Sequence, residues 1–350
     1  MNPASKKIIL LAVAIFFLFQ GCLKDNVSPT INISISNAAL ELNYFEENGD
    51  YINSDQMPSI VKTDEVYNNI NTYLIVDVRS HDAYVAGHIA GAFNIQHDSL
   101  LQFLTGKNIQ TYPKVVLVDE NGQASSYYTC LLRLYGFNNI YNLLFGMAEW
   151  NKNFSAIWEN NINKAFAAYS AFYNKTYPFP EMTPLPDVTL NNSFKNLSDK
   201  IKDRIASLIK EGFNYNTNFV YVSDLLASPT SYYIACYGKD SLYYHYKEDS
   251  KGSGHYINTV LYHPSYDIKS TFHLQTFPND RKILIYSYSG HLSAYLAAYL
   301  RALGYDAKTL MYGASAMFYF YLSYVPTRFY PYIFFTGDVR NYPYTTGEQP

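Results

Sequence analysis

Two stretches of the chain have residue types and spacings that could hold an anion or activate a nucleophile. "VVLVDENGQA" runs from residue 115 to residue 124, and "ILIYSYSGHL" runs from residue 283 to residue 292. Each is a short apolar run typical of a buried strand, followed by a loop with one glycine and then by a helical stretch. Backbone N–H groups at the start of a helix can bind an anion or lower the pKa of a thiol. Both loops are therefore candidate sites.

Neither loop contains a cysteine. The first residue after the strand is Asp119 in the first stretch and Ser287 in the second. A carboxylate at a helix N-terminus caps the helix and repels other anions, so we expect the first loop to be self-capped and structural. The second loop is neutral and is the better candidate for an anion cradle. The residues of this candidate cradle are Ser287, Tyr288, Ser289, Gly290, His291 and Leu292.

His291 is the one candidate base of the second loop. A serine nucleophile needs a positioned base, so Ser287 could serve a hydrolase only if this ring faced it, and the spacing leaves that open. Cys130 lies in a predicted helix, and Cys236 lies in a predicted strand of a different domain. We therefore expect two buried, unpaired thiols. No spacing of His, Cys and carboxylates indicates a metal site, and no motif indicates a cofactor.

The elements that position the two loops repeat along the chain. Residues 115–137 and 283–305 align without a gap, and this alignment places Asp119 on Ser287. The expected strands span residues 72–78, 114–120, 231–237 and 282–288, and the expected helices span residues 124–137 and 293–305. Strands alternating with helices predict an α/β fold with two similar domains, each a parallel sheet covered by helices on both faces. The repeat indicates a tandem duplication.

A helical and proline-rich segment joins the two domains. Residues 148–173 are predicted to be helical, whereas the prolines of residues 177–187 exclude a regular helix. A second, amphipathic helix is expected to begin at an N-cap at Ser198 and to end at Gly212. The predicted boundaries are a signal peptide at 1–22, a tether at 23–55, a first domain at 56–155, a linker at 156–215 and a second domain with an aromatic C-terminal extension at 216–350.

A longer motif surrounds the first predicted strand. "VDVRSHDAYVAGHIAGAFNI", from residue 76 to residue 95, contains Asp77, Arg79, Gly87 and His88. Together with "LYGFNNIYNLLFGMAEW", it resembles the rhodanese domain, and the resemblance covers residues 58–150. Residues 284–317 resemble the loop-containing half of the same domain. We expect Asp77 and Arg79 to form an ion pair or a hydrogen-bonded corner, and His88, like its counterpart His255, to tie loops together.

The resemblance implies a reaction as well as a fold. In rhodanese domains the first loop residue is a cysteine, which takes a sulfane sulfur from a donor such as thiosulfate and passes it to an acceptor. Asp119 and Ser287 stand at this position. We therefore expect a member of this sulfurtransferase family that has lost the reaction and has a binding or scaffold role. The alternatives are a sulfurtransferase that uses a non-standard residue and an anion-binding protein.

The N-terminus has the pattern of a targeting signal. Lys6 and Lys7 precede an apolar run at residues 8–19, which is shorter than a transmembrane helix needs, and Gly21 precedes Cys22. The pattern resembles the lipobox of bacterial lipoproteins, which implies cleavage before Cys22 and lipidation of its thiol. We expect an envelope protein held to a membrane by a lipid anchor, with an unknown protein or small anion as its ligand. The net charge of −3 does not favour nucleic acid.

Overall fold

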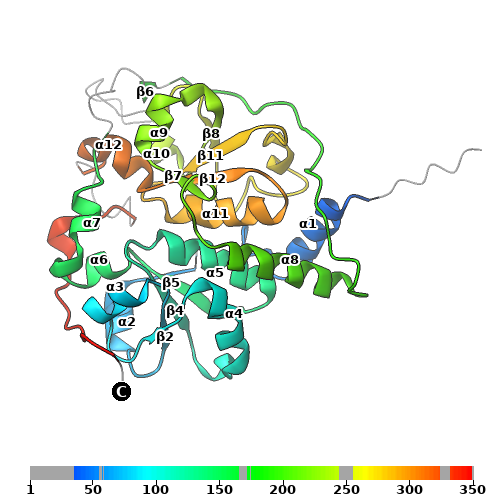
Figure 1. Cartoon of the computed structure of the whole chain (residues 1–350). Coiled ribbons are helices and arrows are strands. Elements are labelled where there is room, and N and C mark those ends of the chain that lie inside the picture. Colours follow the sequence, from blue (N-terminus) through cyan, green and yellow to red (C-terminus); the bar gives the residue numbers. More distant parts are fainter. Residues whose placement is uncertain are drawn as a thin grey trace, which may run out of the picture. The chain divides into compact units, whose positions relative to one another are not determined.

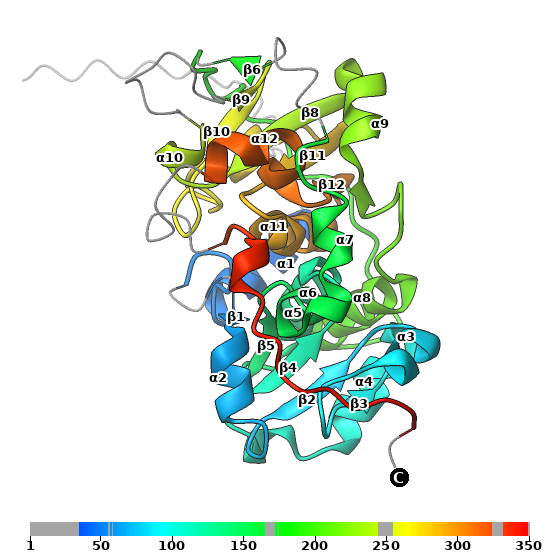
Figure 2. The ribbon, with the colours of Figure 1, turned by 90° about the vertical axis from the view of Figure 1, so that its left-hand side faces the viewer.

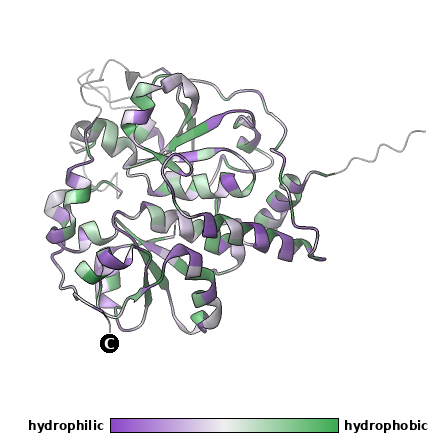
Figure 3. Ribbon diagram, in the orientation of Figure 1, coloured by the Kyte–Doolittle hydropathy of each residue, from purple (hydrophilic) through white to green (hydrophobic). Residues whose placement is uncertain are grey.

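The structure is a computed structural model, and it describes residues 35–54, 57, 59–164, 172–173, 175–243, 255–323 and 332–348. Two five-stranded sheets dominate it, and every strand pair in both sheets is parallel (Figure 1). Most of their strands are coloured hydrophobic (Figure 3), because parallel strands are covered on both faces. The predicted α/β class with two parallel-sheet units is confirmed.

The two sheets have the same topology. The first sheet has the order β1-β5-β4-β2-β3, with β1 at Ile60–Val61, β2 at Leu74–Asp77, β3 at Phe93–Asn94, β4 at Val115–Val118 and β5 at Ile140–Leu143. The second has the order β10-β8-β11-β12-β7, with β7 at Phe219–Val220, β8 at Tyr232–Tyr237, β10 at Val260–Tyr262, β11 at Lys282–Tyr286 and β12 at Ala307–Leu310. Read from opposite ends, the orders match strand for strand, and β4 and β11 are the central strands. A separate antiparallel pair joins β6 (Phe172–Tyr173) to β9 (His255–Tyr256).

Helices surround these sheets. The helices of the first half are α1 (Asn37–Glu47), α2 (Thr63–Asn68), α3 (His81–Ala86), α4 (His97–Gly106), α5 (Gln123–Tyr135), α6 (Met147–Trp150) and α7 (Ala156–Glu159). Those of the second half are α8 (Leu197–Glu211), α9 (Val222–Ala227), α10 (Asp240–Tyr243), α11 (His291–Ala302) and α12 (Gly313–Ser323). Short 3₁₀ turns are η1 (Ile109–Thr111), η2 (Lys152–Phe154), η4 (Pro229–Ser231), η6 (Leu274–Thr276) and η8 (Thr336–Asp338).

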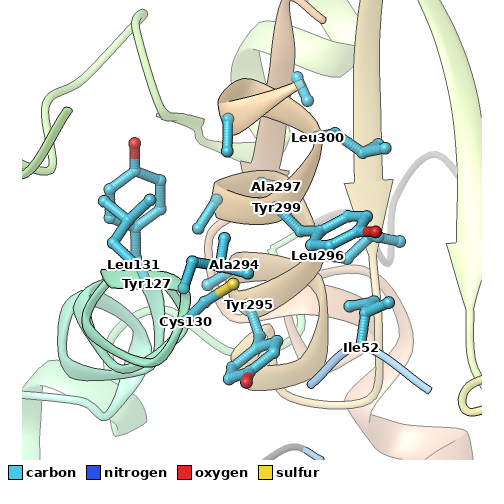
Figure 4. Packing of buried hydrophobic residues seen from close by; sticks show 14 of the residues in the cluster. Ile52, Tyr127, Cys130, Leu131, Ala294, Tyr295, Leu296, Ala297, Tyr299 and Leu300 are labelled. Atoms are coloured by element: carbon cyan, nitrogen blue, oxygen red, sulfur yellow. The ribbon is translucent and has the colours of Figure 1, made fainter. Parts of the chain in front are cut away.

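The two α/β units meet where α5 packs against α11. Both helices are buried along most of their length, as helices are when they lie between two cores. Small residues of α11, Ala294 and Ala297, face α5 and let the two backbones come close, and the side chain of Cys130 points into this contact (Figure 4). Both helices begin directly after the candidate loops, so this packing brings the two loops together.

Two predictions of the linker were wrong. Residues 148–173 do not form one helix: α6 and α7 are single turns separated by η2, because the side chain of Asn151 caps a new turn at Asn153. Helix α8 begins at Leu197, with extended Asn196 at the N-cap, instead of at Ser198. The Ser198 hydroxyl lies 3.0 Å from the Tyr44 hydroxyl of α1 instead. The predicted end of helix α8 at Gly212 is confirmed.

No helix among the described residues is long and apolar enough to cross a membrane.

Candidate functional site

The two candidate loops lie at the C-terminal ends of the central strands β4 and β11. In each, the chain turns through a glycine with positive φ, Gly122 at 89° or Gly290 at 88°, and enters α5 or α11. Residues of positive φ also follow β5 and β12. Just after them, the backbone N–H of Met147 donates to the carbonyl oxygen of Asp119, and that of Ala314 donates to the carbonyl oxygen of Ser287. The two loops are therefore built on one backbone plan.

Asp119 fills the first loop with its own carboxylate. Its oxygens accept hydrogen bonds from the backbone N–H groups of Gly122 (2.6 Å) and Ala124 (2.8 Å) and from the hydroxyl of Ser125 (3.0 Å). The side chain is 1% exposed, and burial raises the pKa of Asp119, although these three hydrogen bonds oppose the rise. The groups that would hold an anion already hold this carboxylate, as the sequence predicted.

Ser287 is held by a chain of hydroxyl groups. Its Oγ accepts from the backbone N–H of Ser293 (3.2 Å) and donates to the Ser293 hydroxyl (3.3 Å). The Ser293 hydroxyl in turn lies 2.8 Å from that of Thr309 on β12. Ser287 is 0% exposed. The predicted nucleophile position of the second loop therefore has internal partners and no contact with solvent.

Each loop is filled by a side chain from the other unit. Gln123, the first residue of α5, accepts from the backbone N–H of Tyr312 through Oε1 (2.8 Å). His291, the first residue of α11, accepts from the backbone N–H of Phe145 through Nε2 (3.1 Å). The two residues occupy the same position in the aligned halves. Tyr312 and Phe145 each precede the glycine that closes a loop, so the two contacts are counterparts of one another.

The loop glycines show how closely these side chains fit. A Cβ atom on Gly122 would lie 2.0 Å from Nε2 of His291, and one on Gly290 would lie 1.9 Å from Nε2 of Gln123. A side chain of the opposite unit thus occupies the space directly above each loop backbone. The anion cradle predicted at residues 287–292 is filled by protein in this structure.

His291 cannot activate Ser287 in this arrangement. Its Nε2 accepts from Phe145, so the network places the proton on Nδ1, which lies 2.9 Å from the hydroxyl of Ser289. Burial lowers the pKa of His291 to about 3, and the ring is neutral at pH 7. Neither ring nitrogen bonds Ser287. The geometry that a serine hydrolase needs is therefore missing from the second loop.

Both described thiols are far from reactive. Cys130 and Cys236 are free and buried, as predicted. Burial raises the pKa of both thiols above the usual value, so the thiolate that would attack a sulfur donor is scarce at neutral pH. Cys130 packs between α5 and α11, and Cys236 lies on β8, between β10 and β11 of the second sheet. Cys22 lies outside the described residues.

The motif around β2 is a structural corner. Arg79 and Asp77 form the predicted ion pair at 2.6 Å, and a second nitrogen-to-oxygen contact aligns the guanidinium with the carboxylate. The Arg79 guanidinium also donates to the Gly87 carbonyl oxygen (2.7 Å). His88 bonds the carbonyl oxygen of Tyr84 through Nδ1 (2.9 Å), and its ring stacks on Tyr84. These contacts tie the β2 loop to α3.

His255 repeats the same contact in the second unit. Its Nδ1 lies 3.1 Å from the carbonyl oxygen of Tyr243, and the two rings stack 3.6 Å apart. The predicted correspondence between His88 and His255 is therefore confirmed in geometry, although the Asp-x-Arg pair has no counterpart in the second half. Within the described ranges, no group of three His, Cys, Asp or Glu side chains could hold a metal ion.

Sequence reasoning missed Gln123 and the two aromatic residues whose N–H groups are bound. A signal was present: "LLFGMAEW" and "LMYGASAM" both place an aromatic residue before glycine after the last strand of a unit. Phe145 and Tyr312 indeed adopt positive φ, at 57° and 62°, which is uncommon for aromatic residues. The sequence pattern could not show which side chains accept from the N–H groups of Phe145 and Tyr312, because each acceptor comes from the other unit.

Comparisons with known proteins found relatives of part of this chain. The family described as "Rhodanese-like domain" matches residues 62–153. The thiosulfate sulfurtransferase GlpE of Pseudomonas putida is 30% identical over 83 residues, which are 24% of this chain and 74% of that protein. GlpE of Shewanella oneidensis is 32% identical over 80 residues, covering 22% and 75% of the two chains. The solved structure of SseA from Escherichia coli, a 3-mercaptopyruvate sulfotransferase, aligns with 72% of this chain and 97% of its own at 15% identity and a TM-score of 0.25.

Proposed function

The chain belongs to the rhodanese-like family of sulfurtransferases, and we propose that it is a member without sulfur-transfer activity, which acts as a binding scaffold anchored to a membrane of the cell envelope. One observation carries the proposal. The position of the nucleophile holds Asp119 and Ser287, and each of these loops is filled by a side chain of the opposite unit. Neither hydroxyl nor carboxylate can form a persulfide, which requires a thiol.

Because both loops are filled by side chains, we assign them a structural role in place of a catalytic one. Gln123 and His291 each satisfy a backbone N–H of the opposite unit, and Ser126 adds a third hydrogen bond across the contact, to the carbonyl oxygen of His291 (2.8 Å). Buried polar groups that are fully paired specify one arrangement of their surroundings. In this proposal, the two loops have become a joint that fixes one unit on the other.

The anchor and the tandem origin are parts of the same proposal. Cys22 would carry the lipid and hold the chain to a membrane by its acyl chains. The matching strand orders of the two sheets support descent from one duplicated unit. The boundaries predicted near residues 56, 156 and 216 stay a prediction. The alternative of a sulfurtransferase with a non-standard residue has less support, because both described thiols are buried.

A sulfur-transfer assay tests the proposal. The chain without residues 1–22 is incubated with thiosulfate and cyanide, and thiocyanate is measured. We expect no turnover above the reagent background, because no accessible thiolate is present to take the sulfane sulfur and release sulfite. Turnover by this chain would overturn the proposal. Labelling of Cys130 and Cys236 with a thiol reagent, before and after unfolding, is the accompanying control and should occur only after unfolding.

Two variants separate the missing nucleophile from the filled loop. Ser287→Cys alone should stay inactive, because Gln123 still occupies the space above Gly290. The double variant Ser287→Cys with Gln123→Ala should gain measurable thiocyanate formation, because the substituted loop then has both a thiol and room for the donor. Activity of the single variant would show that Gln123 does not close the loop.

A further inference from the structure

The C-terminal segment lies on the unit to which it does not belong in sequence. Residues 339–347, here called the C-terminal strap, follow η8, and the side chain of Val339 is still buried in the core of the second unit. From there the strap runs in an extended course along the first unit, against residues of α2, α6 and η2 (red in Figure 2). It is the last described part of the chain, apart from Glu348.

Backbone hydrogen bonds hold the strap to α6 and, through one isolated β-bridge, to the β2–β3 connection. The N–H groups of Arg340 and Tyr342 donate to the carbonyl oxygens of Glu149 and Trp150, both at 2.9 Å. Further along, Thr345 exchanges two backbone hydrogen bonds with a residue of the β2–β3 connection. Such main-chain hydrogen bonds stabilise the bound strap without depending on its side chains.

Side chains of the first unit also bind the strap backbone directly. The indole N–H of Trp150 donates to the carbonyl oxygen of Pro343 (2.9 Å), and the amide of Asn151 donates to that of Tyr342 (2.9 Å). The proline fits this arrangement because only its carbonyl oxygen is used, and it has no N–H to satisfy.

Aromatic side chains give the contact its specificity. The ring of Tyr342 stacks on Tyr67 with centroids 3.8 Å apart and an angle of 3° between the planes. Its hydroxyl donates to Asp64 (2.8 Å), which also forms an ion pair with Arg340 (2.6 Å). Stacked aromatic pairs and charge-assisted hydrogen bonds are among the stronger side-chain contacts. Asp64 and Tyr67 thus bind the side chains of two strap residues, Arg340 and Tyr342.

A second aromatic contact follows two residues later. Tyr344 packs edge-on against Phe154 at 5.0 Å, and its hydroxyl accepts from the amide of Asn153 (2.7 Å). Its ring also lies over Gly87, where a Cβ atom would come within 2.8 Å of it. The glycine of the family motif therefore forms part of the floor under the strap.

We infer that the surface under the strap, here called the strap groove, is a recognition site for an extended Arg-x-Tyr-Pro-Tyr-Thr peptide, and that a second copy of this chain supplies that peptide by exchange of the strap. The strap groove consists of Asp64, Tyr67, Val85–His88 and Glu149–Phe154. The inference deepens the proposed binding role, on which it rests, by naming the site and the partner.

The chain's own strap selects a second copy as the partner. A strap supplied in trans makes the same contacts as one bound in cis, so the exchange loses no contact and costs only the entropy of association. No strap residue belongs to a strand of either five-stranded sheet, so the strap can leave its groove without unfolding a sheet. A lipid anchor would raise the local concentration of neighbouring copies and favour the exchange.

A complementation experiment tests the exchange. One partner is the chain from residue 23 that ends at Asp338 and so has a groove but no strap. The other carries Asp64→Ala and Tyr67→Ala and so has a strap but a defective groove. We expect each to be a monomer alone and the mixture to form a 1:1 pair, measured by size-exclusion chromatography with light scattering. Tyr342→Ala in the second partner should abolish the pair, whereas Thr346→Ala, at an exposed position, should leave it intact.

A labelled peptide of residues 338–350 tests the groove itself. The chain that ends at Asp338 should bind it at least tenfold more tightly than the full chain, whose groove is occupied, and Tyr342→Ala in the peptide should weaken binding at least tenfold. The full-length Tyr342→Ala variant gives the same test without truncation, since its loosened strap should let the peptide bind.

Each outcome decides the inference. Absence of peptide binding by both chains, each shown to be folded by circular dichroism, would overturn the strap groove. Peptide binding without a mixed pair would overturn the second copy as the partner. Neither result would alter the sulfur-transfer assay, and turnover in that assay would overturn the non-catalytic proposal alone.

Discussion

The loop after β4 and the loop after β11 share a backbone but not a chemistry. Both turn through a glycine with φ near 90°, both are closed by a glycine after the next strand, and both are filled by the first helical residue of the opposite unit. They differ in the residue at the family's nucleophile position. The Asp119 carboxylate accepts from three donors, whereas the Ser287 hydroxyl accepts from one backbone N–H and donates a hydrogen bond to the Ser293 hydroxyl.

In our proposal, this difference separates what the fold requires from what sulfur transfer would require. The glycines and the helix N-termini persist in both loops because the turn into α5 or α11 depends on them. The nucleophile position is free to change, since a carboxylate and a hydroxyl each satisfy the surrounding donors in a different way. A carboxylate or a hydroxyl at this position is therefore compatible with both sheets, and in our proposal the two loops serve as an internal joint.

The closing glycines test what the two loops share, with the largest expected effect. Gly313→Ala would place a Cβ atom 2.2 Å from the Ser287 carbonyl oxygen, and Gly146→Ala would place one 2.3 Å from that of Asp119. Both glycines have positive φ, so strain adds to the clash. Each change should lower the free energy of unfolding by about 4 kcal/mol, the upper end of the range for single substitutions, measured by denaturant titration.

Gly91→Ala is the matched control for this pair. Gly91 also has positive φ, at 78°, but no atom lies within 4 Å of an added Cβ. Only the cost of a left-handed alanine remains, about 1 kcal/mol. If Gly91→Ala destabilised the chain as much as Gly313→Ala, the close approach to the loop carbonyl would not be the cause.

The nucleophile positions test how the loops differ. Asp119→Ala leaves one buried and one partly buried backbone N–H group and the Ser125 hydroxyl without their acceptor, and it should lower the free energy of unfolding by about 3 kcal/mol. Ser287→Ala leaves only the N–H of Ser293 unpaired and should cost about 1 kcal/mol. Both values come from denaturant titration at pH 7, and Asp119→Asn, which keeps an acceptor, should fall between them. Equal costs for the two alanine variants would contradict the self-capped first loop.

The side chains that fill the two loops, His291 and Gln123, differ in that only His291 can bind a proton. Burial lowers the pKa of His291 from 6.5 to about 3, so the unfolded chain binds a proton that the folded chain does not. Stability is therefore complete above pH 6.5 and falls as the pH drops toward 3. Between pH 8 and pH 5, this residue should cost about 2 kcal/mol of unfolding free energy.

His291→Gln isolates that contribution. A glutamine keeps an acceptor for the N–H of Phe145, as Gln123 does for that of Tyr312, but cannot bind a proton. Thermal or denaturant unfolding of both proteins between pH 5 and pH 8 should show the smaller pH dependence in the variant. If the unfolding free energy of both proteins changed equally with pH, another group would cause the acid sensitivity, and the buried, neutral state of His291 would be contradicted.

The amino-acid sequence by itself determined the local units. Alternating apolar runs and helical spacing predicted β2, β4, β8, β11, α5 and α11, because these patterns record which face of each element is buried. The absence of a thiol at residues 119 and 287, the capping by Asp119 and the ion pair of Asp77 with Arg79 followed from neighbours close in sequence. The helix predicted at 148–173 failed for a local reason, since asparagine side chains compete for the backbone there.

Only the tertiary structure decided which distant residues meet. His291 and the N–H that it accepts from are 146 positions apart, and no periodicity encodes that pairing. Two further contacts also join residues far apart in the sequence. The Glu46 carboxylate of α1 accepts from the backbone N–H of Ser270 in the second unit, and the C-terminal strap lies on the first unit. Such contacts arise when α5 packs on α11 and fixes the two units, because the partners are then chosen by shape and by unsatisfied hydrogen-bonding groups instead of by spacing along the chain.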